Sequence, residues 1–182
     1  HGQVEPATEH RQHGEHDQRQ RHEPGRLVGV DHPGRAGAVA LQYTLGAPVG
    51  MDMERFAEAD LILIWGSNPI TSNLHFWTLA QQAKRRGARL IAIDPYRSDT
   101  ALKCHQHVAL LPGTDAALAL GMMHVLIEEG LTDQAYIDAH TLGFAALAER
   151  ARAYPPERVA RICGIDAGTV VDLARAYGRA RP

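Results

Sequence analysis

Three short polar turns, each following an apolar run, contain the residues whose types suit nucleotide chemistry. Gly66 permits close backbone approach, and the amides after it can face phosphate oxygens. Asp94 can accept both hydroxyls of a ribose. Asp115 can accept the N1–H and N2–H of guanine, a pair of donors that adenine lacks. The turns are Gly66-Ser67-Asn68-Pro69, Asp94-Pro95-Tyr96-Arg97 and Pro112-Gly113-Thr114-Asp115.

Each of these turns also has a purely structural interpretation. Gly-Ser-Asn-Pro is a good turn sequence, Asp94-Pro95 is a common way to end a strand, and Thr114-Asp115 suits a helix N-cap. The nucleotide interpretation therefore depends on whether the fold brings the three turns to one place.

Apolar periodicity predicts the elements that position these turns. The unbroken apolar run at 61–65 indicates a strand buried on both faces, as in a parallel sheet. The largely apolar segments 89–94 and 107–111 predict a second and a third strand. Helical spacing at 73–86 and 115–129 predicts the crossover helices, and the residues between the second and third strands read as a loop. We therefore expect an α/β fold with a Rossmann-like layered parallel sheet and flanking helices.

In such a sheet, ligands bind beyond the carboxyl ends of the strands, so all three turns should lie along one edge. The G-x-G-x-x-G fingerprint of dinucleotide-binding proteins does not follow the first strand, which disfavours an NAD enzyme.

Further helices are expected on both sides of this core. Residues 51–59 predict a short helix before the first strand. The C-terminal part reads as helical, with Asp166 as an N-cap. The expected C-terminal helices begin at Thr132-Asp133, span 144–154, begin at Pro155-Pro156 and run from Asp166 to Tyr177.

Residues 1–35 differ in composition from the domain predicted over 36–182. Six of the 11 His lie in this stretch, and residues 1–26 contain only Val4 and Ala7 as hydrophobic residues. Such a segment buries too little apolar surface to offset its ordering entropy. We expect a disordered tail or a non-native polar stretch, such as an out-of-frame reading, whose only metal binding would be adventitious.

Composition excludes several classes of protein. A net charge of −2 over 182 residues argues against a basic nucleic-acid binder, and no apolar run reaches the length of a membrane span. No secretory signal is evident, so a cytoplasmic location is expected.

The only two cysteines lie outside any C-x-x-C. Cys104 lies near His105 and His107 but lacks a fourth ligand, so no metal site is predicted, and Cys163 reads as a core residue.

Together, the three motifs resemble the molybdopterin oxidoreductase family, whose members bind bis-(molybdopterin guanine dinucleotide) and include formate dehydrogenases, nitrate reductases and dimethyl sulfoxide reductases. The resemblance covers about residues 36–182, with the motifs in family order. It is carried by Ile64-Trp-Gly-Ser-Asn-Pro69, Ala92-Ile-Asp-Pro-Tyr-Arg-Ser-Asp-Thr-Ala101 and Leu111-Pro-Gly-Thr-Asp-Ala-Ala-Leu-Ala-Leu120.

The resemblance implies a role for each turn. The first turn would lie on the pterin dinucleotide, the second would hold the guanosine ribose, and the third would read the guanine. Many family members have Arg directly after Asp-Pro, whereas here Tyr96 precedes Arg97, so no contact is assigned to Arg97. His75 and Trp65 either approach the cofactor or pack. The implied cofactor-binding residues are Gly66, Ser67, Asn68, Asp94, Pro95, Gly113, Thr114 and Asp115.

The resemblance also implies a partial chain. The four-cysteine iron–sulfur motif, the molybdenum ligand and the domain that completes the second pterin site are not identifiable, so no catalytic residue is assigned. We expect a fragment that binds molybdopterin guanine dinucleotide with molybdenum and has no turnover without the remainder of the oxidoreductase. An iron–sulfur cluster is expected only in the full-length enzyme. The alternatives are a guanine-nucleotide-binding or regulatory module without redox activity, and a non-functional remnant.

Overall fold

The computed structural model describes residues 39–44, 46 and 52–180. The chain divides into two compact units, 1–50 and 51–182. In the first unit, residues 39–44 are helical. The tail predicted over 1–35 lies outside the described residues, and so does Met51.

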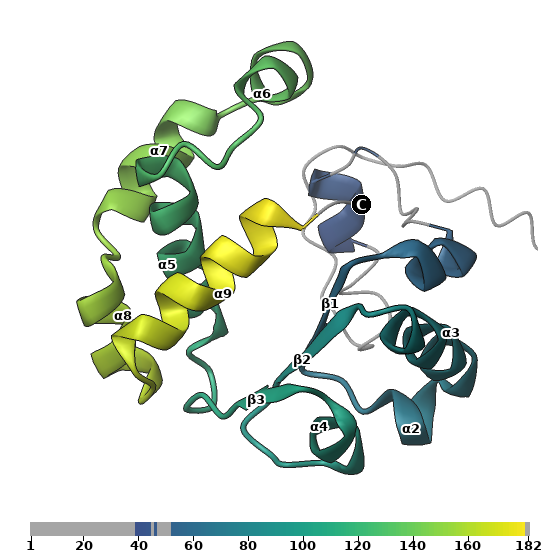
Figure 1. Cartoon of the computed structure of the whole chain (residues 1–182). Coiled ribbons are helices and arrows are strands. Elements are labelled where there is room, and N and C mark those ends of the chain that lie inside the picture. Colours follow the sequence, from purple (N-terminus) through teal and green to yellow (C-terminus); the bar gives the residue numbers. More distant parts are fainter. Residues whose placement is uncertain (1–38, 45, 47–51, 181–182) are drawn as a thin grey trace, which may run out of the picture. The chain divides into compact units, whose positions relative to one another are not determined.

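The second unit alternates strands and helices and then becomes entirely helical (Figure 1). Its elements are η1 (Met53–Glu58), β1 (Leu61–Trp65), α2 (Pro69–Ser72), α3 (Leu74–Arg85), β2 (Arg89–Ile93), α4 (Asp99–Lys103), β3 (Gln106–Val108), α5 (Asp115–Glu128), α6 (Gln134–His140), α7 (Phe144–Arg152), α8 (Pro156–Cys163) and α9 (Ala167–Arg179).

Within the described residues, three strands form a parallel sheet, as the apolar runs predicted. Their order in the sheet is β1-β2-β3. At the carboxyl end the register aligns Trp65 with Ile93 and Ile93 with Val108. All three strands therefore end at the same level.

Each face of the sheet carries its own core, and helices lie on both sides (Figure 1). Ile62, Ile64 and Leu90 pack with Ala80 and Ala83 of α3. On the other face, buried side chains of β2 and β3 pack with α5, α8 and α9. The prediction that β1 is buried on both faces is only half right, because Leu61, Leu63 and Trp65 are half-buried on the α5 side.

Three predicted elements differ from those observed. The segment between the second and third strands contains α4 rather than only a loop. The third strand is Gln106–Val108, shorter than the predicted 107–111, and the helix predicted over 51–59 is a 3-10 helix, Met53–Glu58. These elements are too short for periodicity to define their type or length.

Helices α7, α8 and α9 pack on α5, and α8 also binds the segment after β3, because its Cys163 carbonyl accepts from the Leu111 N–H. Asp166 caps α9, as predicted, by accepting a hydrogen bond from the Thr169 N–H at 3.1 Å. Arg175 of α9 forms a two-oxygen ion pair with Glu129 at the end of α5. Within the described residues, no helix combines the length and the apolar character needed to span a bilayer.

Candidate functional site

The carboxyl edge of the sheet brings the first two polar turns together. Gly66 N–H donates to the Ile93 carbonyl at 2.9 Å, and Asp94 N–H donates to the Val108 carbonyl at 3.1 Å. The sheet ladder thus continues one residue beyond β1 and β2, and places Gly66 and Asp94 side by side at this edge.

The first turn is hydrogen-bonded to α4. Asn68 Oδ1 accepts a hydrogen bond from the Thr100 hydroxyl at 2.6 Å, and the Asn68 carbonyl accepts from Thr71 and Ser72. Gly66 adopts φ +58°, which favours glycine. The Asn68 side chain therefore builds the turn. Within the described part of the chain, the N–H groups of Ser67 and Asn68 donate to no acceptor, and these amides are the ones available to a ligand.

Asp94 is fixed by three hydrogen bonds. Besides its N–H bond to Val108, its Oδ1 accepts from the Tyr96 N–H at 2.7 Å, and its carbonyl oxygen lies 2.8 Å from Nε2 of His107. Oδ2 makes no hydrogen bond with any described residue. The carboxylate therefore presents one unengaged oxygen next to exposed Pro95 and exposed Tyr96.

The third turn is folded back on itself and anchored by α8. Thr114 Oγ1 donates to the Leu111 carbonyl at 2.6 Å, and Leu111 N–H donates to the Cys163 carbonyl at 2.8 Å. Gly113 adopts φ +80°. Thr114 occupies the N-cap position of α5, as its structural interpretation predicted, but its side chain makes no capping hydrogen bond. Its hydroxyl is used within the turn.

Asp115 is oriented by a residue that sequence reasoning had assigned to packing or stacking. The indole Nε1–H of Trp65 donates to Asp115 Oδ1 at 2.7 Å. The Trp65 ring is half-buried against the core on the α5 side of the sheet. The sequence offers no signal for this hydrogen bond because the two residues are 50 positions apart. The bond links the end of β1 to the start of α5, and so joins the first turn to the third.

Other candidate residues have structural partners instead. His75 Nε2 lies 3.6 Å from Glu54 Oε1 on the surface, and His124 Nδ1 lies 3.2 Å from the Ala151 carbonyl, which joins α5 to α7. His105 Nδ1 accepts from the Leu90 N–H at 3.0 Å. Burial raises the pKa of the half-buried Cys104 thiol, and the charge of Lys84 partly opposes this effect. In the portions of the chain that the structure covers, no three His, Cys, Asp or Glu side chains gather as a metal site would require.

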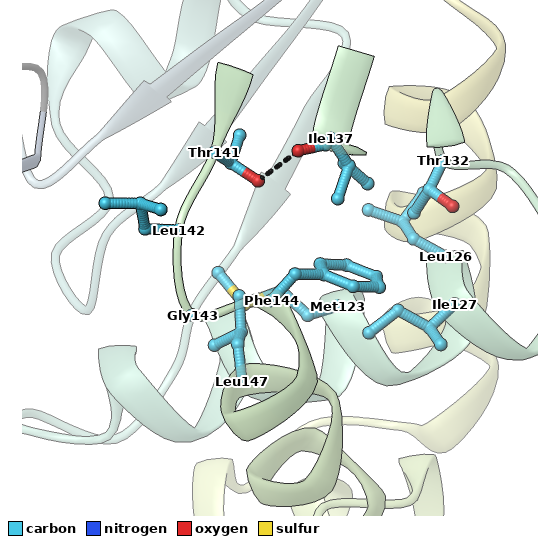
Figure 2. Close-up of a pocket in the computed structure, with 10 residues that line it drawn as sticks. All are labelled: Met123, Leu126, Ile127, Thr132, Ile137, Thr141, Leu142, Gly143, Phe144 and Leu147. Carbon is cyan, nitrogen blue, oxygen red and sulfur yellow. Dashed lines mark hydrogen bonds between the residues drawn. The ribbon is translucent and has the colours of Figure 1, made fainter. Parts of the chain in front are cut away.

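An apolar pocket of about 310 Å³ lies away from these turns, between α5, α6 and α7. Figure 2 shows Phe144 and Ile137 reaching into it from different helices. None of the eight residues predicted to bind the cofactor lines this pocket. Its lining residues are Met123, Leu126, Ile127, Thr132, Ile137, Thr141, Leu142, Gly143, Phe144 and Leu147.

Comparison with known proteins agrees with the motifs and the fold. The family model for molybdopterin oxidoreductase matches residues 29–169. The chain therefore belongs to the molybdopterin oxidoreductase family, as the three motifs indicated.

Individual relatives cover most of this chain but only a small share of their own length. A probable oxidoreductase, YoaE, from Bacillus subtilis is 36% identical over 148 residues, which is 81% of this chain and 22% of that protein. The alpha subunit of an F420-dependent formate dehydrogenase from Methanocaldococcus jannaschii is 35% identical over 156 residues, 83% of this chain and 23% of that protein. The chain thus spans about a fifth of the length of these relatives.

A solved structure has a similar fold. Acetylene hydratase from Pelobacter acetylenicus superposes with a TM-score of 0.59 at 33% sequence identity, covering 67% of this chain and 18% of that one. The named relatives differ in the reaction that their names state, so family membership alone does not assign a substrate.

Proposed function

We propose that this chain is part of a molybdenum-dependent oxidoreductase and holds the guanine dinucleotide portion of molybdopterin guanine dinucleotide at the carboxyl edge of its sheet. Asp94 would lie at the ribose and Asp115 at the guanine. The full set of residues that would hold the group is Gly66, Ser67, Asn68, Asp94, Pro95, Gly113, Thr114 and Asp115. Pro95, Gly113 and Thr114 shape the backbone around these carboxylates.

The observation that carries this proposal is that Asp94 and Asp115 each have one carboxylate oxygen in a hydrogen bond and the other oxygen without one among the described residues. Asp94 and Asp115 each use Oδ1 in a hydrogen bond within the chain, and Oδ2 of each makes none with a described residue. The free amides of Ser67 and Asn68 lie at the end of the neighbouring strand. Hydroxyl and N–H donors of a guanosine suit the carboxylates, and phosphate oxygens suit the amides. The donors and acceptors of this edge therefore fit the group.

When bound, the molybdenum cofactor supplies two-electron redox chemistry, and the protein supplies binding and orientation. In this chain, Asp94 and Asp115 would bind the nucleoside, while Asn68, His107 and Trp65 would keep the backbone and carboxylates in place. The turnover of a whole oxidoreductase needs parts beyond the fifth of its length matched here, so we expect no turnover from this chain alone. A cytoplasmic location stays a prediction.

Nucleotide affinity tests the proposal directly. Calorimetric titration of the 182-residue chain with GDP and with ADP is expected to show a preference for GDP. Asp115→Asn should remove that preference, because its amide N–H group opposes the guanine donors. Asp94→Asn should lower the affinity for GDP and for ADP to the same extent, because both nucleotides carry the same ribose. Loss of a charge-assisted hydrogen bond corresponds to about 1.5–3 kcal/mol, or roughly ten- to hundredfold in affinity.

Asp133→Asn is the matched control. Asp133 caps α6 by accepting from the Tyr136 N–H, a role that Asn also fills, and it lies outside the three turns. This variant should leave both affinities unchanged. Equal affinity of the unaltered chain for GDP and ADP would contradict the guanine assignment, and dye-linked oxidoreductase activity of the chain alone would contradict the expectation of no turnover.

A further inference from the structure

At the proposed edge, the side chain of Trp65 forms a hydrogen bond with the side chain of Asp115. Trp65 is the last residue of β1 and Asp115 the first of α5. Nε1 of Trp65 lies 2.7 Å from Oδ1 of Asp115, the short range expected for a hydrogen bond to a charged acceptor. The indole nitrogen is a donor only, so Trp65 offers no acceptor to the N–H donors of a ligand.

The hydrogen bond restricts the carboxylate. Asp115 is at the start of a helix, where a free carboxylate would rotate among rotamers. The Trp65 ring is held by the core on the α5 side of the sheet, so its N–H has a fixed direction. Asp115 is thereby held in one plane, with Oδ2 and the second lone pair of Oδ1 open to two further donors.

We propose that Trp65 is a positioning residue, which orients Asp115 toward a purine edge that carries paired N–H donors and thereby sets the preference for guanine over adenine. This inference rests on the proposed function, because it assumes that Asp115 meets the base. It goes further in assigning the selectivity to a fixed carboxylate plane and not to the charge alone.

Trp65→Phe separates positioning from packing. Phenylalanine keeps an aromatic ring against the core but removes the N–H donor. We expect GDP affinity to fall by about three- to tenfold, the span of roughly 0.7–1.4 kcal/mol, while ADP affinity changes by less than about twofold. If Trp65 had only a structural role, the substitution would lower the affinity for both nucleotides together.

Trp77→Phe is the matched control, because the chain has two tryptophans. Trp77 lies on α3 and packs against the core on the other face of the sheet. Its indole N–H makes no hydrogen bond to a described residue. We expect this variant to keep the GDP-to-ADP affinity ratio of the unaltered chain.

Nitrogen-15 NMR of the two indole groups gives a second readout, assigned by the same two variants. GDP should shift the Trp65 indole signal and leave the Trp77 signal in place. Asp115→Ala should move the Trp65 signal in the free protein, whereas Asp115→Asn should retain most of the hydrogen-bonded shift, since the amide oxygen still accepts.

The outcomes distinguish the two claims. If the unaltered chain binds GDP and ADP equally, the proposed function fails and this inference fails with it. If the unaltered chain prefers GDP and Trp65→Phe keeps the full preference, only the positioning role is overturned. Loss of the folded-state Trp77 signal in Trp65→Phe would mean that this variant does not fold, and the test then uses the unaltered chain. There, a GDP-induced shift of the Trp65 indole signal supports the positioning role, and the absence of a shift overturns it.

Discussion

The buried hydroxyl of Thr100 donates to Oδ1 of Asn68 over 2.6 Å and ties α4 to the turn that follows β1. The same hydroxyl oxygen lies 3.4 Å from the Ile70 N–H. Thr100 is fully buried, whereas Asn68 is half-buried. A short helix beneath the sheet edge thus sets the conformation of a turn proposed to face the cofactor.

Thr100→Val is expected to destabilise the fold by about 1–3 kcal/mol, because an isosteric methyl group leaves Asn68 Oδ1 without its donor. Chemical denaturation measures this loss. Thr78→Val is the control, since Thr78 is an exposed residue of α3 whose hydroxyl donates to the Leu74 carbonyl of its own helix. That variant should stay within about 0.5 kcal/mol of the unaltered chain. Equal stability of both variants would show that the Asn68–Thr100 bond has no structural weight.

A second prediction concerns the contact between α5 and α8. A Cβ added at Gly121 would lie 2.7 Å from Cγ2 of Val159, a fully buried side chain. Gly121→Ala should therefore destabilise the protein by up to about 2 kcal/mol, because an overpacking cost of about 1–3 kcal/mol outweighs the roughly 1 kcal/mol gain in helix propensity.

Combining the change with Val159→Ala provides its control. Val159→Ala alone opens a cavity, and the methyl group that Gly121→Ala introduces would partly fill it. The double variant should be more stable than the sum of the two single losses by about 0.5 kcal/mol or more. Additive losses in thermal unfolding would contradict direct packing of Gly121 on Val159.

The sequence was sufficient to predict the elements whose signal is local and repeated. The strand over residues 61–65 was predicted at its observed bounds, and α5 was predicted within one residue, because an unbroken apolar run and helical spacing each extend over several residues. The shared edge followed from parallel topology alone. Helix α4 was missed because five residues are too few for periodicity, although Ser98, which accepts from the Ala101 N–H, is an N-cap signal that could have located it.

Contacts across the fold had no local signal. Asn68 and Thr100 are 32 positions apart, and Trp65 and Asp115 are 50 apart. Pattern reasoning placed the turns on one edge but could not identify which carboxylate oxygen each turn leaves open, because that depends on side-chain hydrogen bonds between elements. The family resemblance supplied the proposed roles of the turns, and the structure shows which side chains form hydrogen bonds with them.

A third prediction concerns the ion pair between α5 and α9. The hydrogen bond from the Arg175 guanidinium lowers the pKa of Glu129. A carboxyl group with a lowered pKa in the folded state stabilises the fold above its unfolded pKa, and this contribution is lost as the pH falls through the folded pKa. Glu129→Gln should therefore lower the Tm at about pH 7, and the difference should close as the pH falls below the ordinary carboxyl range of about 4.

Glu149→Gln is the control for that series. Glu149 pairs with Arg152 three residues away on the exposed surface of α7, so its removal breaks no contact between elements. We expect a Tm change of no more than about 1 °C at either pH. A Glu129→Gln difference that persists unchanged at about pH 3 would mean that the stabilisation comes from packing and not from the charge.

The last prediction concerns the reactivity of the two thiols. Burial raises the pKa of Cys104, so at about pH 8 it holds less of the reactive thiolate than a free cysteine does. Iodoacetamide should modify Cys104 several-fold more slowly than free cysteine, while the fully buried Cys163 should react only on unfolding. Lys84→Met should slow the modification of Cys104 further, because the charge of Lys84 lowers the pKa of this thiol.

Cys104→Ser identifies the mass-spectrometric signal of modified Cys104, and denaturant should bring both thiols to the reaction rate of free cysteine. Reaction of Cys104 at the free-cysteine rate in the folded chain would contradict its burial between α4 and β3.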